Sequence, residues 1–360
     1  YRGLSFLVVS CPCALVVSVP LSFFAGIGSA SRQGILIKGS NYLEMLDKAN
    51  VFVFDKTGTL TKGNFVVTAI EPESNKDEVL RLAAIAEHDS NHPIARSIVS
   101  CYRGEIESGY TLTNVAGFGI LATKGDDVIY CGNEKLMKSY DIKYVKQNGV
   151  GTVVYVAKND KFVGSLLISD EIKPESKQAI SELNAMGAKT VMLTGDNEVI
   201  AASVAQEIGL SDYKASLLPQ NKVEHVEQLL SQKKKGDVLC FVGDGINDAP
   251  VLMRSDIGIA MGGVGSDAAI EASDVVLMQD DLKGISTAKR IAKKTMRVVY
   301  ENIVGSLAVK ILIMALSATG ILGAYSMWIA VVGDVGVAIA AILNAMRVNK
   351  GTKTTVKLEK

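Results

Sequence analysis

The sequence has no excess of charge of either sign and contains few cysteines. Its 38 lysine and arginine residues balance 38 aspartate and glutamate residues, so the formal net charge is zero. A nucleic-acid-binding protein typically shows a basic excess, so nucleic acid is not expected as a partner. The five cysteines form one close pair and three scattered singles, a pattern that does not favour a disulfide framework. The chain also contains no internal repeat and no low-complexity segment.

Charged residues are missing from long stretches near both ends of the chain. None lies between Arg2 and Arg32, a segment longer than the about 20 residues that cross a bilayer as a helix. A second apolar stretch near the C-terminus contains only Lys310 and Asp334 as charged residues, and turn-prone residues interrupt it near its middle. Three transmembrane helices are predicted, one at residues 3–31 and two within residues 298–346.

Basic residues flank the predicted membrane helices on one side. They follow the first helix, precede the second and follow the third. By the positive-inside rule these flanks, and the polar middle of the chain, are cytoplasmic. Tyr1 is then on the outer side, so we expect that upstream segments of the protein precede this residue.

The polar middle alternates strand and helix patterns. Apolar or β-branched runs at residues 51–54, 189–193 and 238–242 each end in an acidic or glycine-rich turn, and helical patterns follow at 199–208 and 222–230. This alternation predicts a parallel sheet with helices on both faces. Ligands of such sheets bind beyond the carboxyl ends of the strands, so the three turns are expected to meet at one site.

A different pattern interrupts this sheet. It contains strand-like runs at residues 65–70 and 151–156 and a helical pattern at 76–87. We therefore predict an inserted domain. The predicted domains are residues 47–64 together with 164–281 for the sheet that is interrupted, and residues 65–163 for the insert.

The three turns carry residues suited to phosphoryl transfer. Asp55 ends a buried strand and can act as a carboxylate nucleophile, while the Lys-Thr-Gly-Thr that follows offers amides and hydroxyls to a phosphoryl group. Asp244 and Asp248 are hard oxygen donors suited to Mg²⁺. Thr194 and Lys222 offer a hydroxyl and a positive charge where phosphoryl charge develops. The alternative is that each acidic turn only caps a helix.

Three motifs together resemble the P-type ATPases, and they occur in the order that this family shows. They are Asp55-Lys-Thr-Gly-Thr-Leu-Thr61, Thr194-Gly-Asp196 and Gly243-Asp-Gly-Ile-Asn-Asp248. The resemblance implies a haloacid-dehalogenase-like, Rossmann-like α/β phosphorylation domain with an inserted α+β nucleotide-binding domain and three transmembrane α-helices. It implies that ATP phosphorylates Asp55 and that Asp55, Asp244 and the Thr57 carbonyl hold Mg²⁺. The catalytic residues implied are Asp55, Thr57, Thr194, Lys222, Asp244, Asn247 and Asp248.

The insert carries further similarities to the heavy-metal-transporting class of this family. Ser90-Asn-His-Pro93 is similar to its His-Pro motif, Gly117-Phe-Gly119 to its glycine-rich nucleotide loop, and Glu87 occupies the place of an acid on the adenine side. The resemblance thus implies that ATP binds at Glu87, His92, Gly117 and Gly119. Without the resemblance, a histidine before a proline is typical of a turn.

The first membrane segment contains Cys11-Pro12-Cys13. In a regular α-helix the two thiols would point about 200° apart, so both could not bind one ion. A proline removes a backbone hydrogen bond and can unwind this turn, which allows both thiolates to face one cavity. The motif matches the heavy-metal class and makes Cys11 and Cys13 candidate ligands of the transported ion.

Lys310 and Asp334 lie inside the two C-terminal apolar spans, where charges are costly and function is the default interpretation. Both are equally far from the predicted turn between the spans, so they are expected at the same depth in the membrane. We predict that Asp334 becomes a metal ligand and that Lys310 is its counter-charge when the site is empty. The alternative is a purely structural ion pair.

These spans are similar to those of the zinc, cadmium and lead exporters. The similarity rests on Asp334-Val-Gly336, Leu343-Asn-Ala-Met-Arg347 and Lys310, whereas the Tyr-Asn and Met-x-x-Ser-Ser motifs of copper-transporting relatives are absent. Two thiolates with a carboxylate also suit a divalent ion better than Cu(I). We therefore predict ATP-driven export of Zn²⁺, Cd²⁺ or Pb²⁺ by a multi-pass protein of the plasma membrane with cytoplasmic catalytic domains. The alternatives are a copper exporter of the same family and a membrane-anchored haloacid-dehalogenase-like phosphatase.

The family also has an actuator domain with a Thr-Gly-Glu loop and further N-terminal membrane helices, and the sequence printed here has neither. The expected partners are therefore membrane lipid and the missing N-terminal actuator and transmembrane segments of the same protein, in addition to the transported ion.

Overall fold

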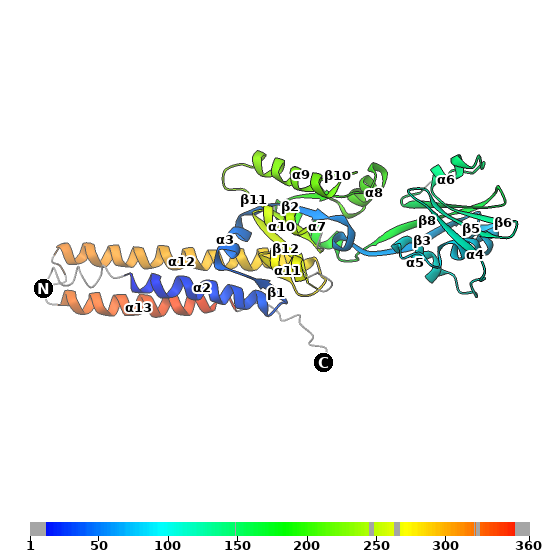
Figure 1. Ribbon diagram of the computed structural model, residues 1–360. Helices are drawn as coiled ribbons and strands as arrows, with labels where there is room; N and C mark the ends of the chain where they lie inside the picture. Colours follow the sequence, from blue (N-terminus) through cyan, green and yellow to red (C-terminus); the bar gives the residue numbers. More distant parts are fainter. Residues whose placement is uncertain are drawn as a thin grey trace.

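The structure is a computed structural model that describes residues 12–147, 149–244, 248–262, 267–319, 321 and 325–349. Cys11, Asn247 and the first part of the predicted helix at 3–31 lie outside the described residues. The described chain forms three parts that follow one another along an elongated molecule, as Figure 1 shows. Long helices form one end, a seven-stranded sheet with its helices forms the middle, and a six-stranded sheet forms the other end.

The middle part is a seven-stranded sheet in the order β1-β13-β12-β11-β2-β9-β10. Every pair of neighbours is parallel except β1 and β13. The strands are β1 (Ile35–Ile37), β2 (Ala49–Asp55), β9 (Lys189–Leu193), β10 (Asp212–Lys214), β11 (Val238–Gly243), β12 (Ile257–Met261) and β13 (Val275–Leu277). The helices are α3 (Ser40–Lys48), α7 (Ser176–Ala185), α8 (Glu198–Ile208), α9 (Pro219–Gln232), α10 (Ala249–Arg254) and α11 (Asp267–Ala272).

Both faces of this sheet are covered, as the continuous apolar strands predict. On β2, Phe52 and Phe54 belong to the core packed with α3, α7 and α8, whereas Val53 belongs to the core packed with α9, α10 and α11. All three side chains are fully buried. The strand that leads to Asp55 is therefore held from both sides, which makes its carboxyl end a rigid place for a functional group.

The second sheet is antiparallel, in the order β3-β8-β7-β6-β5-β4. Its strands are β3 (Thr61–Glu71), β4 (Thr111–Val115), β5 (Gly119–Lys124), β6 (Asp127–Gly132), β7 (Thr152–Lys158) and β8 (Lys161–Ile172), and its helices are α4 (Lys76–Glu87), α5 (Pro93–Cys101) and α6 (Glu134–Ser139). The long pair of β3 and β8 carries the chain from the first sheet to the second and back (Figure 1). The boundaries predicted at residues 64/65 and 163/164 fall inside these two strands.

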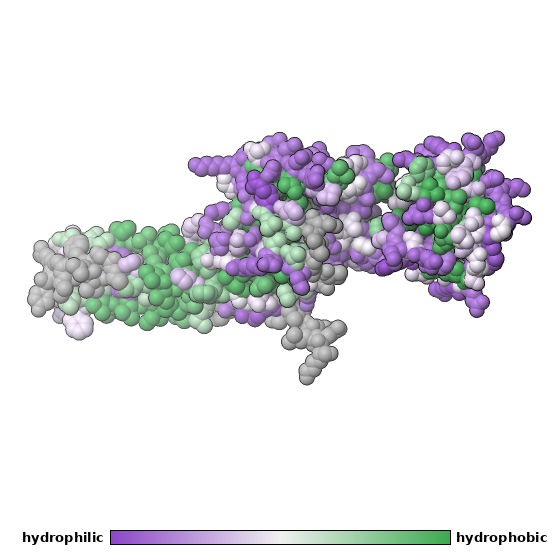
Figure 2. Space-filling model, viewed as in Figure 1, coloured by the Kyte–Doolittle hydropathy of each residue, from purple (hydrophilic) through white to green (hydrophobic). Residues whose placement is uncertain are grey.

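Three long apolar helices form the remaining part: α2 (Cys13–Ser31), α12 (Lys283–Thr319) and α13 (Ser326–Met346). All three are long and apolar enough to cross a membrane, and they contact one another. Figure 2 shows a hydrophobic surface along this bundle and a largely hydrophilic surface over the rest of the view. The described helices therefore agree with the prediction of three transmembrane α-helices.

Helix α12 extends well beyond its apolar part. It begins at Lys283, before the predicted span at 298, and Ile285, Ala288 and Ile291 of its first turns pack in the core of the seven-stranded sheet. One continuous helix therefore joins the sheet that carries Asp55 to the membrane bundle.

Candidate functional site

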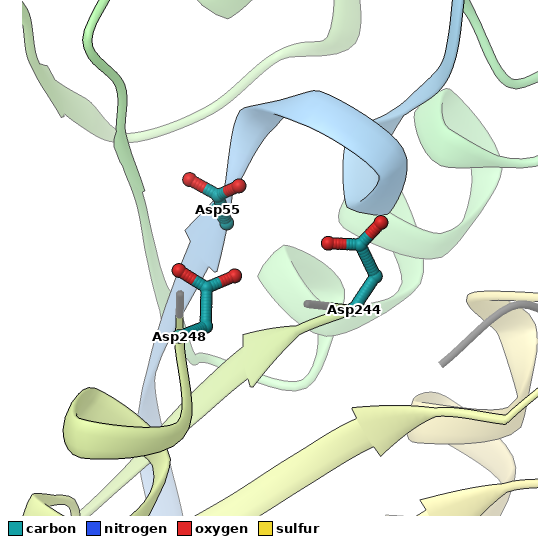
Figure 3. Close-up of side chains that lie close together, drawn as sticks. All are labelled: Asp55, Asp244 and Asp248. Atoms are coloured by element: carbon teal, nitrogen blue, oxygen red, sulfur yellow. The ribbon is translucent and has the colours of Figure 1, made fainter. Parts of the chain in front are cut away.

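Three carboxylates meet at the carboxyl edge of the seven-stranded sheet (Figure 3). Asp55 ends β2, Asp244 follows β11, and Asp248 is the residue before α10. Because β2 and β11 are neighbours in parallel register, their ends place these side chains together. One oxygen atom from each lies within 4.8 Å of the others.

Lys222 of α9 supplies a positive charge to this cluster. Its Nζ lies 2.5 Å from Asp55 Oδ1 and 3.2 Å from Asp248 Oδ1. Burial and the charge of Asp248 raise the pKa of Asp55 to about 6, although Lys222 opposes this shift. Burial also raises the pKa of Asp244 and of Asp248. Burial disfavours the charge on Lys222, but the two neighbouring carboxylates outweigh it, so the pKa of Lys222 is raised.

The cluster is suited to a divalent cation. Three carboxylates face one lysine, so negative charge remains when all are ionised; burial, together with this repulsion, raises the pKa of Asp55. Carboxylate oxygens at this spacing are the hard ligands that Mg²⁺ takes. Gly58 allows the loop after Asp55 to close on the cluster, because a Cβ at this residue, whose φ is +77°, would lie 1.6 Å from Asp244 Oδ2. Thr57 precedes Gly58 in this loop with an exposed side chain, and the role of its carbonyl stays a prediction.

Thr194 follows β9, the other neighbour of β2, so all three turns reach the same edge. Its side chain is buried, and its Oγ1 accepts a hydrogen bond of 3.1 Å from the amide of Asp196. Thr194 thus shapes the turn at the site as well as offering its hydroxyl. Asn247, the remaining catalytic residue that the resemblance implies, lies outside the described residues.

The sequence did not predict a role for two buried lysines near the cluster. Lys56 forms an ion pair with Asp196 and lies 3.9 Å from Asp170. Lys173 donates to the Gly58 carbonyl at 2.6 Å and lies 2.5 Å from Asp280 Oδ1. Both therefore hold the loop that follows Asp55. The available signals were that Lys56 adjoins Asp55 and that Lys173 directly follows a strand end.

The second sheet contains a cavity of about 360 Å³. All four residues predicted for nucleotide binding line it, namely Glu87, His92, Gly117 and Gly119. Glu87 ends α4 and is almost fully buried, and burial raises its pKa. Gly132 and Asn133 also line the cavity and were not predicted. A Gly-Asn pair at a strand end is the signal that could have found them.

Local structure gives a reason for the residue type at three of these cavity positions. His92 is the N-cap of α5, where its Nδ1 accepts from the amide of Ile94 at 3.3 Å, so it has a structural role beside its place in the cavity. Gly117 has a φ of +77°, which favours glycine. A Cβ on Gly119 would lie 2.3 Å from the Cys131 carbonyl, so close strand packing requires this glycine.

In the membrane bundle, Lys310 of α12 and Asp334 of α13 form an ion pair with an N–O distance of 2.7 Å. Both side chains are largely shielded within the bundle. Their matched depth predicted this contact, and their roles in transport stay predictions. Cys13 begins α2. Cys11 lies outside the described residues.

Comparison with known proteins identifies the family of the catalytic part. Residues 49–256 match the model of the haloacid dehalogenase-like hydrolases. The chain belongs to the haloacid dehalogenase-like hydrolase family. The matched region includes the described residues of the predicted phosphorylation site, which are Asp55, Thr57, Thr194, Lys222, Asp244 and Asp248.

Several relatives of this haloacid dehalogenase-like chain are metal transporters. It is 50% identical to the cadmium, zinc and cobalt-transporting ATPase of Bacillus subtilis (strain 168), over 97% of the chain and 50% of the relative. It is also 50% identical to the zinc-transporting ATPase of a Synechocystis species, over 97% of the chain and 49% of the relative. The chain thus spans about half the length of these curated relatives. The resemblance to heavy-metal-transporting P-type ATPases is confirmed.

A solved structure shows the same relationship. The crystal structure of a zinc-transporting PIB-type ATPase in its E2·Pi state matches with a TM-score of 0.83 and 36% identity, over 97% of this chain and 58% of the other. The match covers the membrane helices as well as the haloacid dehalogenase-like part, because it spans nearly all of the chain.

Proposed function

We propose that this chain is the catalytic and C-terminal membrane part of an ATP-driven exporter of divalent heavy-metal ions, Zn²⁺, Cd²⁺ or Pb²⁺. The observation that carries the proposal is the cluster of Asp55, Asp244, Asp248 and Lys222 at one edge of the sheet. The same chain holds the Lys310–Asp334 pair in apolar helices, and its relatives are named as zinc and cadmium transporters.

The cluster supports a phosphoryl transfer to Asp55. A carboxylate oxygen of Asp55 attacks the γ-phosphorus of ATP, the bond from phosphorus to the β,γ-bridging oxygen breaks, and ADP leaves. Lys222 and Thr194 stabilise the charge on the transferring group. Mg²⁺, held by Asp55, Asp244 and the Thr57 carbonyl, would supply further charge neutralisation when bound.

The cavity in the second sheet would hold the ATP base. Glu87, His92, Gly117 and Gly119 all line it. The paired strands β3 and β8 connect this sheet to Asp55. Closure of the two parts about these strands would bring the γ-phosphate to Asp55.

The transported ion would bind in the membrane bundle. In this proposal Cys11, Cys13 and Asp334 are its ligands, and Lys310 neutralises Asp334 when no ion is bound. The bundle would lie in the plasma membrane with the catalytic parts on the cytoplasmic side. The N-terminal half of the transporter, with its actuator domain and further membrane helices, and membrane lipid would be its partners.

Two other functions give different expectations. A copper exporter would respond to Cu(I) alone, whereas a membrane-anchored phosphatase would hydrolyse substrate without any response to metal. Helices that only anchor a phosphatase would not need a buried lysine–aspartate pair, which is costly in a membrane. A Cu(I) site built from soft sulfur ligands would not need the carboxylate either. Metal-stimulated ATP hydrolysis by the full-length protein, measured with Zn²⁺, Cd²⁺, Pb²⁺ and Cu(I) under reducing conditions, separates the three.

The nucleophile is tested by Asp55→Asn in the full-length protein. The variant should still bind ATP but should form no acid-stable, hydroxylamine-labile phosphoprotein, because the amide cannot attack phosphorus. Asp126→Asn, in the exposed turn between β5 and β6, is the matched control and should label like the wild type. Retention of the label in Asp55→Asn at the wild-type level would contradict the assignment.

A further inference from the structure

A buried cysteine thiol contacts one of the residues that line the cavity of the second sheet. Cys131 is the residue of β6 that precedes Gly132, which lines the cavity. Its side chain is fully buried, and its Sγ donates a hydrogen bond to Glu87 Oε1 with an S–O distance of 3.7 Å. Cys131 thus contacts the carboxyl group of a residue that lines the cavity.

The protonation states give this hydrogen bond its direction. Burial and the charge of Glu87 raise the pKa of Cys131 well above its usual range, so the thiol keeps its proton and donates. Burial raises the pKa of Glu87, whereas hydrogen bonds from Cys131 and Ser90 oppose that rise. The two donors thus offset part of the effect of burial and restrict the rotation of the carboxylate.

The position does not require a cysteine for packing alone. The other buried members of this core cluster, among the residues that the structure describes, are alanine, valine, leucine and isoleucine. Alanine is somewhat smaller than cysteine and valine somewhat larger, and neither has a side-chain hydrogen to donate. Cys131 is thus the one buried residue of the cluster whose side chain can donate to Glu87.

A carboxylate placed beside the six position of a purine distinguishes adenine from guanine and hypoxanthine. It only accepts hydrogen bonds. Adenine presents an amino donor at its six position, whereas guanine and hypoxanthine present a carbonyl oxygen there. A carboxylate oxygen at the six position thus accepts from the amino group of adenine and repels the carbonyl of the other two bases.

We propose that Cys131 is a positioning residue for base selectivity, which holds the Glu87 carboxylate so that it accepts a hydrogen bond from the amino group of adenine. This inference rests on the proposed nucleotide site. It adds a residue that does not itself touch the nucleotide and a reason why ATP is preferred over nucleotides with a six-carbonyl base.

The test compares the affinities for ATP and ITP, which differ at the six position, by calorimetry on the full chain without Mg²⁺. The wild type should favour ATP by about tenfold or more. Cys131→Ala and Cys131→Val, which both lack the donor, should each lose about fivefold in affinity for ATP and little for ITP. Cys131→Ser, which keeps a donor, should restore the wild-type ratio. Two apolar variants are used so that one folded protein is available if the other is unstable.

Cys240→Ala is the matched control, since Cys240 is equally buried but lies on β11 of the other sheet. It should lower stability without changing the ratio of the two affinities. An unchanged ratio in a folded Cys131→Ala or Cys131→Val protein would overturn the inference, as would failure of Cys131→Ser to restore it.

His92→Ala distinguishes failure of the proposed nucleotide site from failure of the proposed role of Cys131. If this variant binds ATP like the wild type, the nucleotide site itself is misassigned, whereas weaker binding with a ratio insensitive to residue 131 overturns only the role of Cys131.

Discussion

At Asp55, burial and electrostatic attraction oppose each other. Burial and Asp248 penalise the ionised carboxylate, and the lysine at 2.5 Å only partly compensates. A nucleophile must nevertheless be ionised to attack phosphorus. A divalent cation bound beside Asp55, as proposed, would favour the ionised carboxylate.

The affinity of the chain for Mg²⁺ should therefore fall as the pH decreases through about 6. The pKa of Asp55 is raised to about 6, so below this pH a proton competes with the metal, and the affinity should drop by about tenfold per pH unit. In the metal-free chain the raised pKa of Asp55 stabilises the folded state at low pH, and this stabilisation is lost as the pH rises through about 6. The increase in thermal midpoint caused by Mg²⁺ should consequently be larger at pH 7.5 than at pH 5.5.

Asp55→Asn is the comparison for this measurement. It removes one titrating group, so its weaker Mg²⁺ response should depend less on pH between 5.5 and 7.5. The same Mg²⁺-induced increase at both pH values in the wild type would show that Asp55 is not a ligand or that its pKa is not raised.

At the scale of elements, helix α12 links the membrane bundle to the strand that carries Asp55. Lys289 of α12 donates to the carbonyls of Ala49, of Asp47 at 3.2 Å and of Leu46 at 3.4 Å. These carbonyls end α3, where a helix leaves its last carbonyls without partners. Because β2 follows α3 directly, this one side chain connects α12 to the start of β2.

Lys289→Met should lower the stability of the phosphorylation domain by about 1–3 kcal/mol, because it leaves buried carbonyls without a donor while it keeps the apolar volume. The measurement is the shift in thermal or denaturant midpoint of the full chain in detergent. Lys293→Met, one turn along the same helix at an exposed position, is the matched control and should change the midpoint little. Equal effects of the two substitutions would show that the Lys289 contacts contribute no stability.

At the scale of the whole molecule, the proposed chemical and transport sites lie on different parts of the chain. The carboxylate cluster belongs to the middle sheet, and the Lys310–Asp334 pair belongs to two helices of the bundle (Figure 1). Coupling between them requires a rigid connection, and the continuous helix α12 supplies one, because it carries Lys310 and also packs in the core of the sheet.

In the full-length protein, Asp334→Ala should abolish phosphorylation from ATP that depends on Zn²⁺ or Cd²⁺, because it removes the carboxylate proposed to bind the transported ion. Phosphorylation of Asp55 by inorganic phosphate should remain largely intact, because the sheet that carries Asp55 is unchanged. Both reactions are measured as incorporation of labelled phosphate under reducing conditions. Val335→Ala, at the next and exposed position of α13, is the matched control and should behave like the wild type. Normal Zn²⁺ dependence in Asp334→Ala, or stimulation of the wild type by Cu(I) alone, would contradict divalent export.

Local sequence determined the elements that carry the site. Helix α4 runs from Lys76 to Glu87 as predicted, and β9 from Lys189 to Leu193, because the apolar periodicity of each is clear and polar residues or turn signals bound both. The ends of β2, β9 and β11 meet because parallel neighbours expose their carboxyl ends at one edge. The contact between Lys310 and Asp334 was also predicted from the sequence. In antiparallel helices joined by a turn, the depth of each residue follows from its distance along the chain from that turn.

Tertiary structure alone decided the contacts between residues far apart in the chain. The periodicity of a long apolar span does not show that α12 begins at Lys283, because its first turns are polar on one face and become buried only against the sheet. Nothing in the local sequence of Lys173 or Cys131 indicates their partners Gly58 and Glu87, which other strands and helices bring within reach. Local sequence sets backbone preference and burial, whereas the choice of a hydrogen-bond partner depends on how the elements pack.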